Sequence, residues 1–126
     1  MTPELTYLVW SAVLTFVLVL IAVGGATQQV GLPKLAANRD DVPEMTGWAG
    51  RAQRAHRNML ESLVLFAILV LVAHLASRTN WVTLLGCQLF FWGRAAHAAI
   101  YIAGVPWLRT AAWGVSVIGL ALILWQ

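Results

Sequence analysis

Four long apolar stretches, separated by shorter polar segments, dominate the 126-residue chain. The first covers residues 5–26, and a helix of that length spans about 33 Å, enough to cross the hydrocarbon core of a bilayer. Residues 51–76, 81–103 and 107–126 form three further stretches that are long and mostly apolar. The pattern predicts an all-α integral membrane protein, organised as one domain in a bundle of four transmembrane helices.

Residues 27–50 interrupt this pattern, and we expect them to form the one long loop. Pro33 and Pro43 lie within this segment beside several glycines and a polar run, so no helical periodicity continues through it. The connections near residues 77–80 and 104–106 are short by comparison.

Composition agrees with a membrane protein, since 60% of the residues are hydrophobic and 10% are charged. Soluble domains carry about 25% charged residues. The formal net charge of +3 arises from basic residues beside apolar stretches, which argues against a nucleic-acid partner. The single cysteine, Cys87, excludes an intramolecular disulfide, and its apolar surroundings favour a buried apolar role.

Basic residues are distributed unevenly between the two predicted sides of the membrane. The long loop and the start of the second helix carry Lys34, Arg39, Arg51, Arg54 and Arg57. Only Arg78 lies on the opposite side, and cytoplasmic loops are generally enriched in Lys and Arg. We therefore expect the long first loop to be cytoplasmic and both termini to lie on the other side.

The second stretch opens with a polar motif. At about 100° per residue, Arg54, Arg57, Asn58 and Glu61 fall on one face of a helix, whereas His56 points the other way. A charge near the bilayer centre costs at least about 2.5–3.5 kcal/mol unless it has a partner or a wet cavity. The four residues of that face are therefore expected to point into the bundle.

Other roles remain open for several of these charges. Arg51 lies close enough to the helix end to reach lipid phosphates, the role that we favour for it. Glu61 can pair with Arg57 four residues earlier or hold the ammonium group of a ligand. A structural bridge from Glu61 to Arg94 is a further alternative.

A second polar set lies on the third and fourth stretches. Arg94, His97 and Tyr101 are spaced by three and four residues, which places them on one stripe of a helix. Arg109 and Thr110 open the last helix, where Arg109 is also suited to anchoring a loop. Arginines outnumber acids within these helices, so the interior is expected to attract an anion.

The sequence offers no set of side chains at metal-ligand spacing. The three histidines lie on different helices or faces without carboxylate or cysteine companions, so no metal site is predicted. It also lacks a nucleophilic triad, a phosphate loop and a dinucleotide-binding fingerprint.

Two ordered motifs resemble a known family. They read Arg54-Ala-His-Arg57-Asn58-x-x-Glu61, then Arg94-x-x-His97-x-x-x-Tyr101 followed by Pro106-x-x-Arg109-Thr110. From about Gly31 to the end, the chain resembles the membrane-associated proteins in eicosanoid and glutathione metabolism (MAPEG). This resemblance implies a homotrimer that binds glutathione between neighbouring subunits near the cytoplasmic side.

The resemblance also implies roles for individual residues. Those expected to hold glutathione are Arg54, Arg57, Asn58, Glu61, Arg94, His97, Tyr101 and Arg109. Arg109 would also stabilise the glutathione thiolate, Thr110 stands where a serine hydroxyl can assist, and Asp41 resembles a loop acid of the isomerase branch. Ser62, Trp113 and Val30 depart from the family pattern, which favours glutathione binding over eicosanoid chemistry.

The function that follows from this resemblance is a membrane-bound glutathione transferase or peroxidase. Glutathione would be the co-substrate, and the second substrate a lipophilic electrophile or lipid hydroperoxide that arrives through the surrounding lipid. The alternative is a non-catalytic membrane protein that binds glutathione or an anionic lipid headgroup. A multidrug-type cation transporter fits less well, because the predicted interior carries an excess of positive charge.

Overall fold

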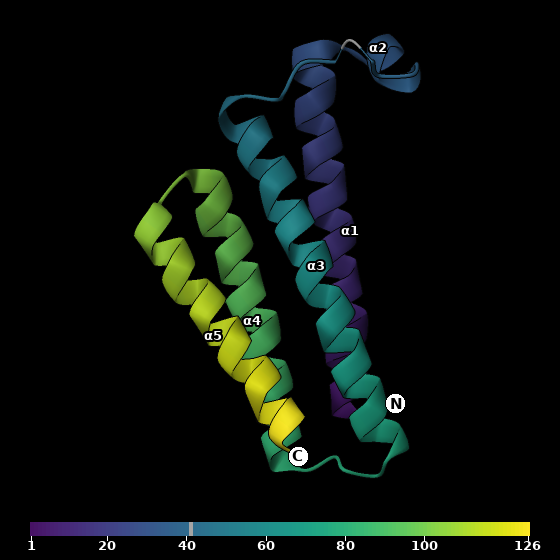
Figure 1. Ribbon diagram of the computed structural model, residues 1–126, viewed down its shortest axis with the longest axis vertical. Coiled ribbons are helices and arrows are strands. Elements are labelled where there is room, and N and C mark those ends of the chain that lie inside the picture. Colours follow the sequence, from purple (N-terminus) through teal and green to yellow (C-terminus); the bar gives the residue numbers. More distant parts are fainter. Residues whose placement is uncertain (41) are drawn as a thin grey trace.

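The computed structural model describes residues 1–40 and 42–126, and every regular element in them is helical. The elements are α1 (Pro3–Val30), α2 (Leu32–Ala36), α3 (Gly47–Leu75), α4 (Trp81–Ala103) and α5 (Pro106–Trp125). Figure 1 shows α1 beside α3 and α4 beside α5, with both chain termini at the end opposite the long loop. Residues far apart in the sequence therefore meet along the sides of α3 and α4.

Local sequence signals set the helix ends. The Thr2 hydroxyl accepts a hydrogen bond of 3.3 Å from the backbone N–H of Leu5 and so caps the start of α1. Asn80 and Thr83 form a reciprocal capping box at the start of α4. Gly104 ends α4 with a φ of 86°, a left-handed conformation that favours glycine. The α4–α5 connection is consequently tight.

The segment 27–50, expected to be a loop, contains more helix than its sequence suggests. The first helix continues to Val30, a short α2 follows, and α3 begins at Gly47, ahead of the expected residue 51. The Gln29 side chain explains part of the difference, because it accepts from the Thr46 N–H at 3.0 Å and donates to the Thr46 carbonyl at 2.7 Å. This clamp ties the end of α1 to the start of α3.

Within the described residues, three helices, α1, α3 and α5, are long and apolar enough to cross a membrane. This part of the chain is thus an all-helical membrane protein with three candidate spans, one fewer than the four expected. With 23 residues, α4 has sufficient length, since about 20 are needed. Its polar side chains, Gln88, Arg94 and His97 among them, account for its lower hydropathy.

The interior is apolar near the middle of the helices and contains a polar contact toward the chain termini. Near the middle, the rings of Phe66 and Phe90 stack at 4.0 Å between centroids, and Cys87 is fully buried close by, in the apolar role expected of it. Toward the termini, the Thr83 hydroxyl donates a hydrogen bond of 3.1 Å to the buried carboxylate of Glu4. This contact was not predictable from the sequence, because Glu4 stands directly before the apolar stretch 5–26 and 79 positions from Thr83.

The two pairs of helices differ in length. At about 1.5 Å per residue, α1 and α3 measure roughly 42–44 Å and α5 about 30 Å. Accordingly, α1 and α3 extend beyond the α4–α5 turn at the end that carries the long loop (Figure 1). The polar motif of α3 lies near this end, level with the turn, and this brings the two sequence motifs together.

Candidate functional site

A polar cavity of about 280 Å³ lies where α3, α4 and α5 meet near the α4–α5 turn. Its lining residues are Asn58, His97, Tyr101, Arg109, Thr110 and Trp113. The three helices each contribute residues that the two sequence motifs had singled out. The cavity is close to the lower limit of typical ligand sites, about 300 Å³, and one side of it is open.

Tyr101 lies at the centre of this site. Its hydroxyl accepts a hydrogen bond of 3.3 Å from Nε of Arg54 on α3. The Arg109 guanidinium, from α5, lies 4.4 Å from the centre of the tyrosine ring, within the range of a cation–π contact. The His97 ring meets the same tyrosine edge to face at 5.5 Å. Tyr101 thus contacts both Arg109, which lines the cavity, and Arg54, which approaches from α3.

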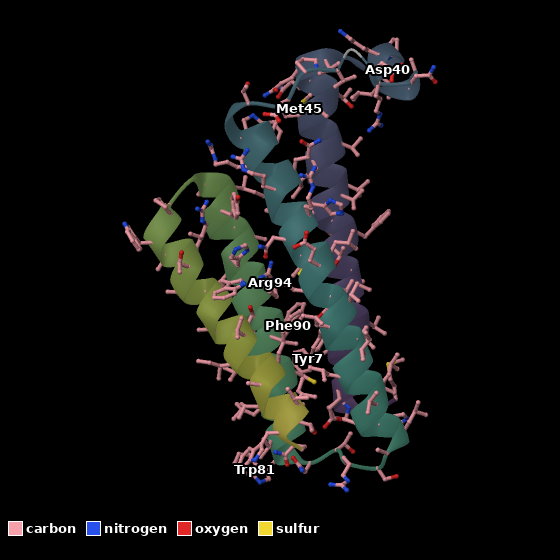
Figure 2. All side chains as sticks on the ribbon, in the orientation of Figure 1. Tyr7, Asp40, Met45, Trp81, Phe90 and Arg94 are labelled. Carbon is pink, nitrogen blue, oxygen red and sulfur yellow. The ribbon has the colours of Figure 1, made fainter. Side chains whose placement is uncertain are left out.

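Arg94 is placed differently from the other site residues. Its side chain is only 1% exposed, and Figure 2 shows it in the interior between α3 and α4. One guanidinium nitrogen, Nη2, donates to Oδ1 of Asn58. Nε and Nη1 have no hydrogen-bond partner within the described part of the chain. The partner of Arg94 is therefore Asn58, and the alternative bridge to Glu61 is wrong.

The polar face of α3 does not point wholly inward. Arg54 reaches Tyr101 and half-buried Asn58 reaches Arg94, but Arg54, Arg57 and Glu61 are all exposed on the single chain. The expectation that all four point into the bundle is therefore wrong for one isolated subunit. The cause is that α3 packs against α1 through another face, where Ala49 lies against Gly25. Ala52 and Ala55 are likewise fully buried.

Arg51 has a structural role in place of the favoured contact with lipid phosphate. Its Nε donates a hydrogen bond of 2.9 Å to the carbonyl of Ile102 in the last turn of α4. The last carbonyls of a helix lack intrahelical partners and carry partial negative charge, so a guanidinium is a suitable partner. Arg51 thereby fastens α3 to the α4–α5 turn beside the cavity.

His56 lies on the other side of α3, as its position in the motif predicts. Together with Gln53 it borders a separate cavity of about 500 Å³ between α1, α3 and the long loop. Apolar residues such as Val19 and Leu35 form much of the wall of this second cavity. His56 is therefore not part of the site around Tyr101.

Thr110 and Trp113 border the cavity from α5 and are both exposed. The Thr110 hydroxyl donates a hydrogen bond of 3.2 Å to the Pro106 carbonyl one turn earlier. Thr110 therefore lines the cavity with its hydroxyl proton already engaged by this carbonyl. Asp41, the suggested loop acid, lies outside the described residues.

Residues 1–40 and 42–126 contain no group of three His, Cys, Asp or Glu side chains able to hold a metal ion. The cavity is instead bordered by cationic and neutral hydrogen-bonding groups. Such an arrangement suits an organic anion with several hydrogen-bonding groups.

Comparison with known proteins supports the resemblance seen in the motifs. The MAPEG family model matches residues 5–126, which is nearly the whole chain. A comparison with curated proteins found no match.

Proposed function

Since this chain belongs to the MAPEG family of membrane proteins of glutathione and eicosanoid metabolism, we propose that it is a glutathione-dependent transferase or peroxidase. Its second substrate is a lipophilic electrophile or a lipid hydroperoxide. The observation that carries the proposal is the meeting of Arg109, Tyr101 and Asn58 from three helices around one cavity. Family membership alone does not distinguish an enzyme from a binding protein, so the residues of this cavity carry the argument.

Glutathione and the residues around the cavity are complementary in charge. Glutathione carries two carboxylates and one ammonium group, and ionisation of its thiol adds a further negative charge. Arg54, Arg57 and Arg109 match the anionic groups, because guanidinium groups bind carboxylates in a bidentate manner. Glu61 matches the ammonium group. His97 and Tyr101 complete the polar wall.

Arg109 is the residue proposed to activate the thiol. A free cysteine thiol titrates near pH 8.5, and a guanidinium beside the bound thiol lowers its pKa by stabilising the thiolate. Each unit of lowering corresponds to about 1.4 kcal/mol of selective stabilisation. The thiolate is the nucleophile. The Thr110 hydroxyl lines the same cavity and can donate a hydrogen bond to the thiolate or to the leaving group once it releases the Pro106 carbonyl.

The functional unit is proposed to be a homotrimer in which α4 is the fourth membrane span. Arg57 and Glu61 are exposed on a stripe of α3 that continues through Val64 and Ile68. Charges inside a membrane almost always face protein or water, at a cost of at least about 2.5–3.5 kcal/mol otherwise. A second subunit packed on this stripe would shield both charges and close the open side of the cavity.

The site is proposed to face the cytoplasm, where glutathione is available. The basic residues of the long loop and the start of α3 lie at the same end of the molecule as the cavity, and Lys and Arg favour the cytoplasmic side. Both chain termini then lie on the opposite side of the membrane, together with Arg78 (Figure 1). Cysteine accessibility labelling of intact cells at either terminus measures this orientation.

The proposal is tested with purified protein in detergent or nanodiscs. Glutathione should raise the thermal unfolding temperature through preferential binding to the folded state, and the protein should conjugate glutathione to a hydrophobic aryl halide or reduce a lipid hydroperoxide. Binding without turnover across diverse electrophiles would instead indicate a non-catalytic protein. Native mass spectrometry should find three copies of the 13.8 kDa chain.

A further inference from the structure

Arg94 and the cavity are separated by the side chain of Asn58. Arg94 is buried between α3 and α4 and does not line the cavity. Asn58 lines the cavity and also contacts the Arg94 guanidinium. A bound molecule in the cavity would therefore meet the amide of Asn58 and not the guanidinium of Arg94. The matching family motif suggested that Arg94 itself holds the ligand, so its position requires a different role.

The chemistry of the two groups fixes how the amide is oriented. A guanidinium has only donors, so the Asn58 atom next to it must be the carbonyl oxygen Oδ1. The opposite orientation would bring the NH₂ group of the amide against the N–H groups of Arg94. With Oδ1 held by Arg94, the donor end of the amide is the part that remains for the cavity.

We propose that Arg94 is a positioning residue that locks the Asn58 amide with its NH₂ group toward the cavity, so that this point of the site binds an oxygen acceptor. The inference rests on the proposed function and adds a specific requirement to it. The group that binds here is a carboxylate or peptide carbonyl of the co-substrate, and its ammonium group must bind elsewhere.

The burial of Arg94 makes rotation of the Asn58 amide costly. Arg94 has no carboxylate beside its guanidinium among the described residues, and its Nε and Nη1 are without partners there. Rotation of the Asn58 amide would remove the hydrogen bond that the structure gives to this buried cation, at a cost that is large for a charged group. The positive charge also polarises the amide and strengthens its NH₂ group as a donor.

The test compares substitutions that alter either the Asn58 amide or the Arg94 guanidinium. Asn58→Asp preserves an acceptor for Arg94 but removes the donor that faces the cavity. We expect the unfolding temperature to stay at or above that of the wild type, whereas affinity for S-hexylglutathione, measured by calorimetry, falls at least about tenfold. Asn80→Asp makes the same chemical change at a helix cap and should leave affinity unchanged, since both residues are good caps.

Variants of Arg94 test the guanidinium that donates to Oδ1 of Asn58. Arg94→Met removes the donor that holds Oδ1 and should weaken S-hexylglutathione binding about tenfold, while Arg94→Lys keeps a donor and should recover most of the affinity. Equal affinities of Arg94→Met and Arg94→Lys, or unchanged affinity of Asn58→Asp, would overturn the proposed role. Asn58→Asp is informative even where an Arg94 variant does not fold.

Thermal unfolding without ligand separates this inference from the proposed function. Loss of the buried contact predicts a lower unfolding temperature for Asn58→Leu than for Asn58→Asp. If the wild type fails to bind glutathione, the proposed function is wrong, and the two unfolding temperatures still test the contact. If the two variants unfold at the same temperature, the lock is absent whatever the protein binds.

Discussion

The two ends of the α4–α5 hairpin are built from opposite kinds of residue. Away from the turn, the helices touch through backbone: a Cβ atom added to Gly119 would lie 2.5 Å from the Gly86 carbonyl oxygen and 2.8 Å from the Phe90 nitrogen. Near the turn, the bulky side chains of Tyr101 and Arg109 meet instead and border the polar cavity. A single pair of helices thus contains a closely packed seam and an open site.

The difference shows how a small membrane protein can hold polar groups in place. Glycine contact lets two helices approach closely, which is a main source of attraction between helices in lipid. The seam fixes the relative position of α4 and α5, and the same geometry then places Arg109 against Tyr101 several turns away. Substitutions at the open end are expected to change chemistry, and substitutions at the closed end to change stability.

The largest expected effect is loss of turnover in Arg109→Ala. Removing a group that stabilises developing or fixed negative charge costs about a hundred- to thousandfold in rate. Because Arg109 is proposed to lower the pKa of the bound thiol, its loss should also move the acidic limb of the pH–rate profile to higher pH. Steady-state kinetics with varied glutathione, repeated across pH, measures the turnover and the acidic limb. Equal losses in turnover and in glutathione binding would contradict this role of Arg109.

At the closed end, Gly119→Ala should destabilise the protein by about 1–3 kcal/mol, because its methyl group meets backbone atoms that cannot move aside. Gly114→Ala is the matched control on the same helix, since its methyl group would have no neighbour within 4 Å. That variant should be neutral or more stable by up to about 1 kcal/mol. Thermal unfolding in detergent compares the two, and equal stabilities would refute the close seam.

Arg51→Gln should have an intermediate effect at the junction of the two pairs of helices. Loss of the charged hydrogen bond to the Ile102 carbonyl is expected to cost about 1–2 kcal/mol. The change should appear as faster amide hydrogen exchange in the last turn of α4, with little change in exchange near the termini. Uniform exchange rates across α4 in wild type and variant would exclude the fastening role.

Thr110→Val is expected to have the smallest effect. In the wild type, the Thr110 hydroxyl donates to the Pro106 carbonyl, so only the lone pairs of its oxygen are available to a ligand without rearrangement. A neutral hydrogen bond contributes about 0.5–1.5 kcal/mol, which limits the loss of turnover to about tenfold. Thr110→Ser, which keeps the hydroxyl, should retain wild-type rates. A loss as large as that of Arg109→Ala would show that Thr110 contributes directly to catalysis.

Much of the fold was predictable because apolar length alone specifies membrane helices. The helix ends near Asn80 and Gly104 also follow from residues with strong local preferences. The extension of α3 to Gly47 was not predictable, because it depends on a clamp from Gln29 seventeen positions earlier. Contacts of this kind are set by tertiary structure and leave no periodic signal.

Some residues that line the cavity could be singled out from the sequence, but their partners could not. Helical spacing placed Arg94, His97 and Tyr101 on one stripe, and the structure brings His97 and Tyr101 to one cavity. Spacing within one helix does not reveal which residue of another helix lies opposite, so the pairing of Arg94 with Asn58 emerged only in three dimensions. The direction of Arg57 and Glu61 likewise depends on which face of α3 packs against α1.

The contact of one tyrosine with two arginines has a consequence for how such proteins diverge. Arg54 and Arg109 belong to different helices, yet both rest on Tyr101. A change at any one of these positions removes a contact made by another, so we expect selection to act on the three together. Among relatives they should be replaced together as a set, while their immediate neighbours in sequence drift independently.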